Sequence, residues 1–425
     1  MIFSPYADEA DVIKKIQKIR NGDYVLLRLT PTMIEKNNLD ANELLREMLY
    51  KYQIVDYDSV EHGGNNGVEF RSQMIHSNRV DPMKLKFYRV NNIRGDRRFS
   101  IETIKKRFHE GDLLYISAYT KQDGKPEIFV INLTREVPSE ELIQATVGYD
   151  LITQKFIEIR PLLAEIVHGG FYNNSKGRGP AAPKDVGDTL ESLLKISTNN
   201  STRADISGLI ELKAKEAKTL DTLFTLRPNF EGTEVAQYEA NDRNRVSAFA
   251  RLYGYESEKH PGCKSLYITV GSADYPQNGQ GFYLEVDEIN AKVSLMRMDS
   301  QTGKREETAY WTFENLKKQL MEKHPATLWI KAVKRVQDGI VQFKYTNIEF
   351  SRTPQFMTFL SLIKTGIITY DWRGYTSKKG KYTGKNHGNA WRIKPAARAE
   401  LFGELETIEF DTDAKILDNY SSLHF

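Results

Sequence analysis

The sequence has little cysteine, little net charge and no long apolar run. Its one cysteine, Cys263, excludes an internal disulfide framework and a zinc centre built on several cysteines, and it suits a reducing compartment. A formal net charge of +3 means that nucleic-acid binding must rest on local clusters of charge. No apolar stretch could cross a bilayer, and Asp8 and Glu9 stand where a secretion signal would carry cations. We therefore expect an intracellular protein with no membrane contact.

The length of 425 residues, of which 40% are hydrophobic and 11% aromatic, is enough for two hydrophobic cores. Residues 1–140 predict a first domain, because short apolar segments alternate there with turn signals. The expected strands are Tyr24–Leu29, Lys84–Val90, Leu113–Ala118 and Ile128–Leu133. One amphipathic helix is expected, at Ala41–Tyr50. Such a pattern favours a small β-barrel or sandwich.

A basic segment crosses this first domain. Between Lys84 and Arg107 nine basic residues stand against two acidic ones, a local balance of +7. The predicted loop at 91–98 contributes candidate DNA contacts, since asparagine and arginine pair with base edges and phosphates. These candidates are Asn92, Arg94, Arg97 and Arg98. A solvated loop beside a basic helix face explains the same charge and stays open.

Lys86-Phe87-Tyr88, followed by Arg94-Gly95-Asp96-Arg97-Arg98-Phe99, resembles the arrangement in B3-like DNA-reading barrels, including the effector domain of EcoRII-type restriction enzymes. The resemblance covers about thirty residues. It implies that arms projecting from the barrel enter the major groove of DNA.

Residues 141–180 predict a helical and glycine-rich linker region. Leu151–Val167 has helical periodicity, and the polar run that follows contains Gly177-Arg178-Gly179. This run lacks the Gly-Lys-Ser/Thr ending of a phosphate-binding loop, so nucleotide hydrolysis has no support there.

The segment Arg203–Lys213 carries a candidate catalytic mechanism. In a β-strand, Ile210 and Leu212 would face a core while Glu211 and Lys213 face the opposite side together. Asp205 precedes them across Gly208, a residue that permits a turn. Two carboxylates that hold Mg²⁺ and a lysine that orients water are the minimum for phosphodiester hydrolysis. Taken alone, the bare pattern is better explained by an ordinary edge strand with a surface Glu–Lys pair.

The surroundings of this segment resemble a known family. Gly-x-x-Leu-Glu-x-Leu-Leu-x-Ile, at 187–196, precedes Ala-Asp-Ile-x-Gly-x-Ile-Glu-Leu-Lys, at 204–213, and Thr-Leu-Phe-Thr follows at 222–225. In order and spacing these segments resemble the MvaI/BcnI group of MutH-like PD-(D/E)xK nucleases. Ala204 departs from the pattern, because many such enzymes have proline before the aspartate. The resemblance implies a mixed central sheet flanked by helices over residues 181–425.

A second basic stretch lies between Lys364 and Arg398, where nine basic residues stand against Asp371 alone, a local balance of +8. Aromatic residues and four glycines are interleaved with it, so we expect a pliable loop that contacts phosphates and bases. His387-Gly388, followed by Trp391-Arg392-Ile393, resembles a His-Gly-x-x-Phe-Arg-Ile segment of the same family. Candidate DNA contacts here are Arg373, Asn386, His387 and Arg392.

The family resemblance implies a type II restriction endonuclease of the prokaryotic cytosol. On this reading Asp205 and Glu211 bind Mg²⁺ and Lys213 assists the attacking water. Glu191 completes the acidic cluster or acts from behind it. The enzyme would be a monomer that cuts double-stranded DNA at a short, pseudo-palindromic site by two sequential nicks, with the first domain binding a second copy of the site. A modification-dependent nuclease, a MutH-like nickase and a non-catalytic DNA-binding regulator remain as alternatives.

Overall fold

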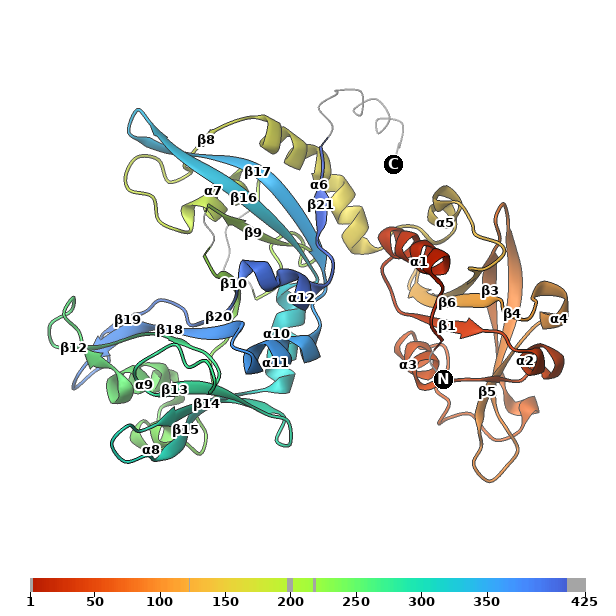
Figure 1. Ribbon diagram of the computed structural model, residues 1–425, viewed down its shortest axis with the longest axis horizontal. Helices are drawn as coiled ribbons and strands as arrows, with labels where there is room; N and C mark the ends of the chain where they lie inside the picture. The colour runs from red at the N-terminus through yellow and green to blue at the C-terminus, as the bar shows by residue number, and fades with distance from the viewer. Residues whose placement is uncertain (1–2, 122, 197–201, 217–218, 411–425) are drawn as a thin grey trace. The chain divides into compact units, whose positions relative to one another are not determined.

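The computed structural model describes residues 3–121, 123–196, 202–216 and 219–410 (Figure 1). The chain separates into two compact units, Met1–Gln154 and Lys155–Phe425. The division at residues 140 and 180 expected from the sequence stays a prediction. Within the glycine-rich segment, β8 (Tyr172–Asn173) pairs with a strand of the second unit, so part of the expected linker has regular structure.

The first unit is built on a seven-stranded open sheet in the order β1-β6-β7-β3-β4-β5-β2. All five segments expected from the sequence form the predicted type of element. The strands are β1 (Tyr24–Arg28), β2 (Leu39–Asp40), β3 (Val68–Ile75), β4 (Val80–Arg89), β5 (Arg97–Ile101), β6 (Leu113–Thr120) and β7 (Pro126–Asn132). The helices are α1 (Ala7–Ile19), α2 (Pro31–Lys36), α3 (Glu43–Lys51), α4 (Ile104–Arg107) and α5 (Glu140–Val147). The sheet is a half-barrel whose edges are β1 and β2.

Both faces of this sheet are buried. Along β6, Leu114 and Ile116 pack in one cluster with α3, whereas Leu113 and Tyr115 pack in another with α1 and α5. An apolar run without alternation is what a strand covered on both faces requires. The expected small barrel or sandwich is therefore an open sheet with helices on both faces, and it is not identified as a B3 barrel.

The basic loop expected at 91–98 is shorter than predicted. Arg97 and Arg98 belong to β5, which pairs with β4, whereas Asn92 and Arg94 are exposed in the preceding turn. Arg97 is ion-paired with Asp58 and Arg98 with Asp40. Only two of the four candidate DNA contacts in this unit thus lie in a loop.

The described residues of the second unit form three sheets, and helices α10, α11 and α12 lie between the two larger ones (Figure 1). The first has the order β21-β17-β16-β9 with β8 added to β17, the second β10-β20-β18-β12-β11 with β19 added to β18, and the third β13-β14-β15. The strands are β9 (Glu211–Lys215), β10 (Asp221–Thr225), β11 (Tyr255–Glu256), β12 (Cys263–Val270), β13 (Phe282–Asp287), β14 (Lys292–Met298), β15 (Arg305–Thr312), β16 (Ala326–Gln337), β17 (Ile340–Arg352), β18 (Ile368–Ser377), β19 (Gly384–Asn386), β20 (Ala390–Ile393) and β21 (Glu406–Ile408). The helices are α6 (Leu151–His168), α7 (Asp185–Leu193), α8 (Glu234–Tyr238), α9 (Arg245–Tyr253), α10 (Phe313–Lys323), α11 (Phe356–Lys364) and α12 (Arg398–Phe402).

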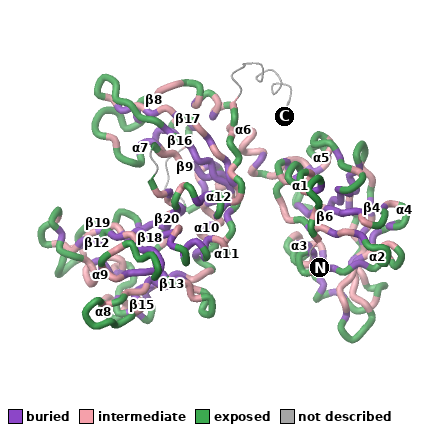
Figure 2. Tube along the Cα trace, viewed as in Figure 1, coloured by how far each residue is buried: buried purple, intermediate pink, exposed green. Residues whose placement is uncertain are grey.

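Aromatic side chains form much of the core of this unit, and in Figure 2 buried residues gather on its strands. Trp311, Trp329, Trp372 and Trp391 are each no more than 1% exposed. The basic stretch at 364–398 is not one pliable loop, because β18, β19 and β20 run through it. Tyr370, Trp372 and Trp391 are core residues and cannot stack on DNA bases. None of the helices described is long and apolar enough to cross a membrane.

Candidate active site and DNA-contact residues

A tight turn brings Asp205 back against β9. Ser207 and Gly208 have φ values of +53° and +72°, and the Leu209 N–H donates to the Ile206 carbonyl at 2.8 Å. Positive φ at both central residues is the signature of a type I′ turn, which reverses the chain in two residues and favours glycine. The turn explains why a carboxylate six positions before Glu211 can reach the same place.

The Asp205 carboxylate is fixed by the backbone of β9. Its Oδ2 accepts a hydrogen bond from the Leu212 N–H at 2.9 Å. Burial and the neighbouring Glu211 carboxylate raise the pKa of Asp205, and Lys323 offsets only part of that rise. Two carboxylates that repel each other in a partly buried place favour a cation between them.

Glu211 and Lys213 lie on β9, which pairs in parallel with β16. The Glu211 side chain is 1% exposed, and its Oε1 accepts from the Lys213 Nζ at 2.5 Å. Ile210 and Leu212 are buried as expected from the alternation. Glu211 is nevertheless buried too, and Lys323 at the end of α10 lies against its carboxylate.

The cation between the carboxylates is Lys323, at the last position of α10. Its Nζ lies 2.9 Å from Glu211 Oε2 and 3.3 Å from Asp205 Oδ1, and it donates to the Arg203 carbonyl at 3.2 Å. Burial lowers the pKa of Lys323, but attraction to Glu211 and Asp205 outweighs this, so its pKa is raised. Sequence reasoning missed Lys323, because nothing in Met-Glu-Lys-His marks a contact with Asp205, 118 positions away.

His324 anchors this lysine. It is fully buried, its Nε2 donates to the Leu223 carbonyl at 2.8 Å, and its Nδ1 accepts from the Thr327 hydroxyl at 2.8 Å. Burial lowers the pKa of His324 to about 3, so the ring is neutral at ordinary pH. The neutral ring joins the end of α10 to β10 and β16.

The donor set fits a hard divalent cation. Carboxylate oxygens from Asp205 and Glu211 are ligands that Mg²⁺ prefers, and Mg²⁺ keeps several waters, so two protein carboxylates suffice. The ammonium of Lys323 already occupies the position between them. Glu191 lies on α7, which packs against β9. Within the part of the chain that the structure describes, no three histidine, cysteine or acidic side chains form a metal-binding group, so Glu191 is not placed as a third ligand.

The candidate DNA contacts of the second unit gather on β18, β19 and β20. Arg373 Nη2 lies 2.7 Å and Arg392 Nε 2.6 Å from Oδ2 of Asp371, a side chain with no exposure. Asn386 and His387 are exposed. They lie near the two arginines, because Asn386 pairs with Gly374 and the His387 N–H donates to the Arg373 carbonyl at 2.9 Å. Asp371 thus aligns two arginines side by side. The sequence showed it only as the one acid in a basic stretch.

Comparisons with known proteins identify the family to which most of the second unit is similar. The model of the MvaI/BcnI restriction endonuclease family matches residues 162–402. The solved complex of restriction endonuclease MvaI with cognate DNA substrate is 24% identical, with a TM-score of 0.51, and the match covers 60% of this chain and 99% of that chain. MvaI in the absence of DNA is 21% identical, with a TM-score of 0.37, over 60% of this chain and 98% of that chain. No curated protein matches the chain. The family match begins beyond the first unit.

Proposed function

Because the chain belongs to the MvaI/BcnI restriction endonuclease family and is therefore a deoxyribonuclease, we propose that it is a Mg²⁺-dependent type II enzyme. It hydrolyses phosphodiester bonds in double-stranded DNA at a short, specific, pseudo-palindromic site. The single observation that carries this proposal is the meeting of Asp205, Glu211 and Lys213 at one partly buried place.

Asp205 and Glu211 hold the metal in this proposal. When bound, Mg²⁺ lowers the pKa of its water and neutralises charge that develops on the phosphoryl group. The hydrogen bond from the Leu212 N–H keeps the Asp205 carboxylate in position. Glu191, on α7, completes the acidic cluster or acts from behind the metal ligands.

Lys213 is the residue that positions the attacking water. Its ammonium is held by Glu211 Oε1, and it keeps further N–H donors for a water or a non-bridging phosphate oxygen. An ammonium fixed in this way stabilises negative charge that appears in the transition state without rearranging. Lys323 balances the negative charge of the two carboxylates when no metal is bound. When a metal takes that place, the Lys323 ammonium pairs with the phosphate instead.

Arg373 and Arg392 are proposed to read DNA. Asp371 binds each guanidinium on one side, and the remaining donors are free to form paired hydrogen bonds with a guanine edge or a phosphate. Asn386 and His387 add exposed polar groups beside them. A pair of arginines held by one buried carboxylate is pre-organised, so less entropy is lost on binding.

The first unit is proposed as a second DNA-binding element, with Asn92 and Arg94 as its exposed contacts. Arg97 and Arg98 contribute charge while remaining paired with acids. The enzyme would act as a monomer with one catalytic centre, so a double-strand break takes two successive nicks. Binding of a second copy of the site by the first unit would recruit or activate the nuclease.

Incubation with plasmid and phage DNA tests this function. Discrete fragments are expected with Mg²⁺ and intact DNA with EDTA, and nicked circles should precede linear DNA if the strands are cut in turn. Asp205→Asn should leave DNA intact under Mg²⁺, whereas Asp274→Asn, at an exposed position, should cut normally. Equal cutting by the Asp205 variant would refute the assignment. Methylated and unmethylated substrates compared in parallel identify a modification-dependent enzyme.

A further inference from the structure

A pocket of about 530 Å³ lies in the first unit, where the two edges of the half-barrel face each other. Leu27, on the edge strand β1, and Asp40, on the opposite edge strand β2, both line it. The pocket therefore occupies the gap that a closed barrel would fill with hydrogen bonds. Its volume falls within the range of sites that hold a small organic ligand.

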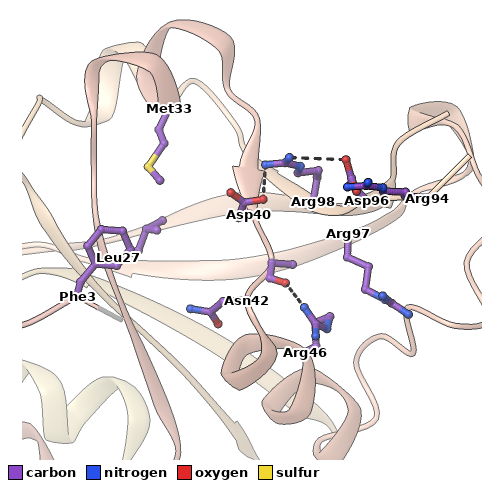
Figure 3. Close-up of a pocket in the computed structure, with 11 residues that line it drawn as sticks. Phe3, Leu27, Met33, Asp40, Asn42, Arg46, Arg94, Asp96, Arg97 and Arg98 are labelled. Atoms are coloured by element: carbon purple, nitrogen blue, oxygen red, sulfur yellow. Dashed lines mark hydrogen bonds and ion pairs between the residues drawn. The ribbon is translucent and has the colours of Figure 1, made fainter. Parts of the chain in front are cut away.

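The walls of the pocket differ in chemistry (Figure 3). Phe3, Leu27 and Met33 form one side, as Figure 3 shows. Four arginines and two aspartates line the remainder, which gives a local balance of +2. An apolar side that includes an aromatic ring, facing a cationic side, fits a ligand with a flat apolar part and an anionic part.

Several polar groups of the cationic wall are without partners. Arg94 is exposed and makes no hydrogen bond or ion pair with any other described residue that the structure records. Arg46 donates from Nη1 to the Ala41 carbonyl at 2.7 Å, which leaves its other nitrogens available. The enclosed Nε of Arg98 also has no hydrogen-bond partner among the residues that the structure describes, although the guanidinium is ion-paired with Asp40. The Asn42 Oδ1 caps α3 and leaves the amide nitrogen of Asn42 available.

We propose that this pocket binds one nucleotide, with its base against Phe3 and Met33 and its phosphate against Arg94 and Arg46. Guanidinium groups are suited to phosphate recognition, and base stacking on an aromatic ring tolerates any base. The Asn42 amide can donate to an acceptor on the edge of the base. The proposal rests on the proposed DNA binding by the first unit.

The nucleotide can come from two sources. An unpaired nucleotide of a DNA strand can enter the pocket, or a free mononucleotide can fill it. A base in a duplex must first be unstacked and unpaired, and this cost is absent for a nucleotide that is already unpaired. A preference for unpaired nucleotides in DNA therefore identifies the first source.

The test compares two labelled duplexes that differ by one unpaired nucleotide, titrated with the full-length protein in EDTA. The bulged duplex should bind roughly tenfold more tightly or better, because it avoids the unpairing cost. Arg94→Ala should reduce the ratio of the affinities for the bulged and the fully paired duplex to near one. Arg71→Ala, which removes an exposed arginine of β3 outside the pocket, should weaken both duplexes alike and keep the ratio.

Met33→Trp provides a second variant, because a larger side chain fills the apolar side of the pocket. It should also bring the ratio of the affinities for the bulged and the fully paired duplex to near one. Titration with deoxynucleoside monophosphates, observed by NMR, tests the other source. Binding of mononucleotides that Arg94→Ala abolishes, together with a ratio of one, assigns the pocket to free nucleotides. A ratio of one without mononucleotide binding overturns the proposal. These binding measurements are made in EDTA, so they do not depend on Mg²⁺-dependent cutting. A failure of cutting and a failure of nucleotide binding can therefore be told apart.

Discussion

Lys323 Nζ lies 2.9 Å from Glu211 Oε2, so the candidate active site carries its own counter-cation at the end of α10. Lys323→Met should strengthen Mg²⁺ binding in the absence of DNA by at least about tenfold, because a positive charge within about 4 Å opposes a second cation by several kcal/mol at an effective dielectric constant near 20. Calorimetric titration with Mg²⁺ measures this change.

Lys318→Met is the matched control for that variant, since Lys318 is an exposed lysine of the same helix. Its Mg²⁺ affinity should equal that of the wild type. Unchanged or weaker binding by Lys323→Met would show that the ammonium supports the metal site instead of competing for it.

Cleavage should fall on acidification because of Asp205. Burial and Glu211 raise the pKa of its carboxyl, so Asp205 takes up a proton at a higher pH than an ordinary aspartate. Only the ionised carboxylate binds metal, so protonation competes with Mg²⁺. The acid limb of the rate profile should therefore move to lower pH when the Mg²⁺ concentration is raised. An acid limb at the same pH for all Mg²⁺ concentrations would exclude Asp205 as the titrating ligand.

Asp371→Asn should reduce sequence discrimination. Without the charge of Asp371, Arg373 and Arg392 lose their common anchor and each pays an ordering cost on binding DNA. A good paired contact with a base contributes about 1–3 kcal/mol to discrimination, so the ratio of specific to non-specific binding should fall roughly tenfold or more. Competitive binding of duplexes with and without a sequence that the enzyme cleaves measures that ratio. Lys379→Ala, at an exposed position of the same region, should lower both affinities and preserve the ratio.

His324 should destabilise the second unit in acid. Its pKa is lowered from 6.5 to about 3 by burial, so the unfolded chain binds a proton that the folded chain excludes. Stability is therefore unaffected above about pH 6.5 and falls as the pH drops toward 3. Between pH 6.5 and 5 the loss is about 2 kcal/mol. Urea unfolding of His324→Gln should show a smaller difference between these two pH values than the wild type. Identical differences would contradict the buried neutral ring.

The pattern of Asp205, Glu211 and Lys213 was predictable from the sequence because these residues lie close together along the chain. Alternation along residues 210–213 and the glycine at 208 were enough to predict a strand preceded by a turn, and the structure has both. The burial of Glu211 was not predictable, since it depends on β16 and α10, which are far along the chain. The contact of Lys323 was not predictable for the same reason, and the contact of Asp371 with Arg392 depends on the pairing of β18 with β20.

The basic stretches were harder to interpret than the strand pattern. Charge counts place Arg98 and Arg373 in basic clusters, but each is paired with a particular acid. Asp40 reaches Arg98 through the register of β2 on β5, and Asp371 precedes Arg373 by two positions on β18. Aromatic residues among the charges suggested stacking surfaces, yet Trp372 and Trp391 point into the core. Composition does not reveal which face of a strand a side chain occupies.

Lys323 and Asp205 are 118 positions apart, and this separation has a consequence for synthesis. A ribosome adds about 5–20 residues per second, so roughly 6–24 s pass between the emergence of the aspartate and that of its lysine partner. During this interval β9 also lacks β16, the strand it pairs with. The nascent chain therefore carries exposed carboxylates without an assembled cutting centre. A nuclease whose candidate catalytic strand lacks its neighbour during this interval spares the DNA of the cell that is making it.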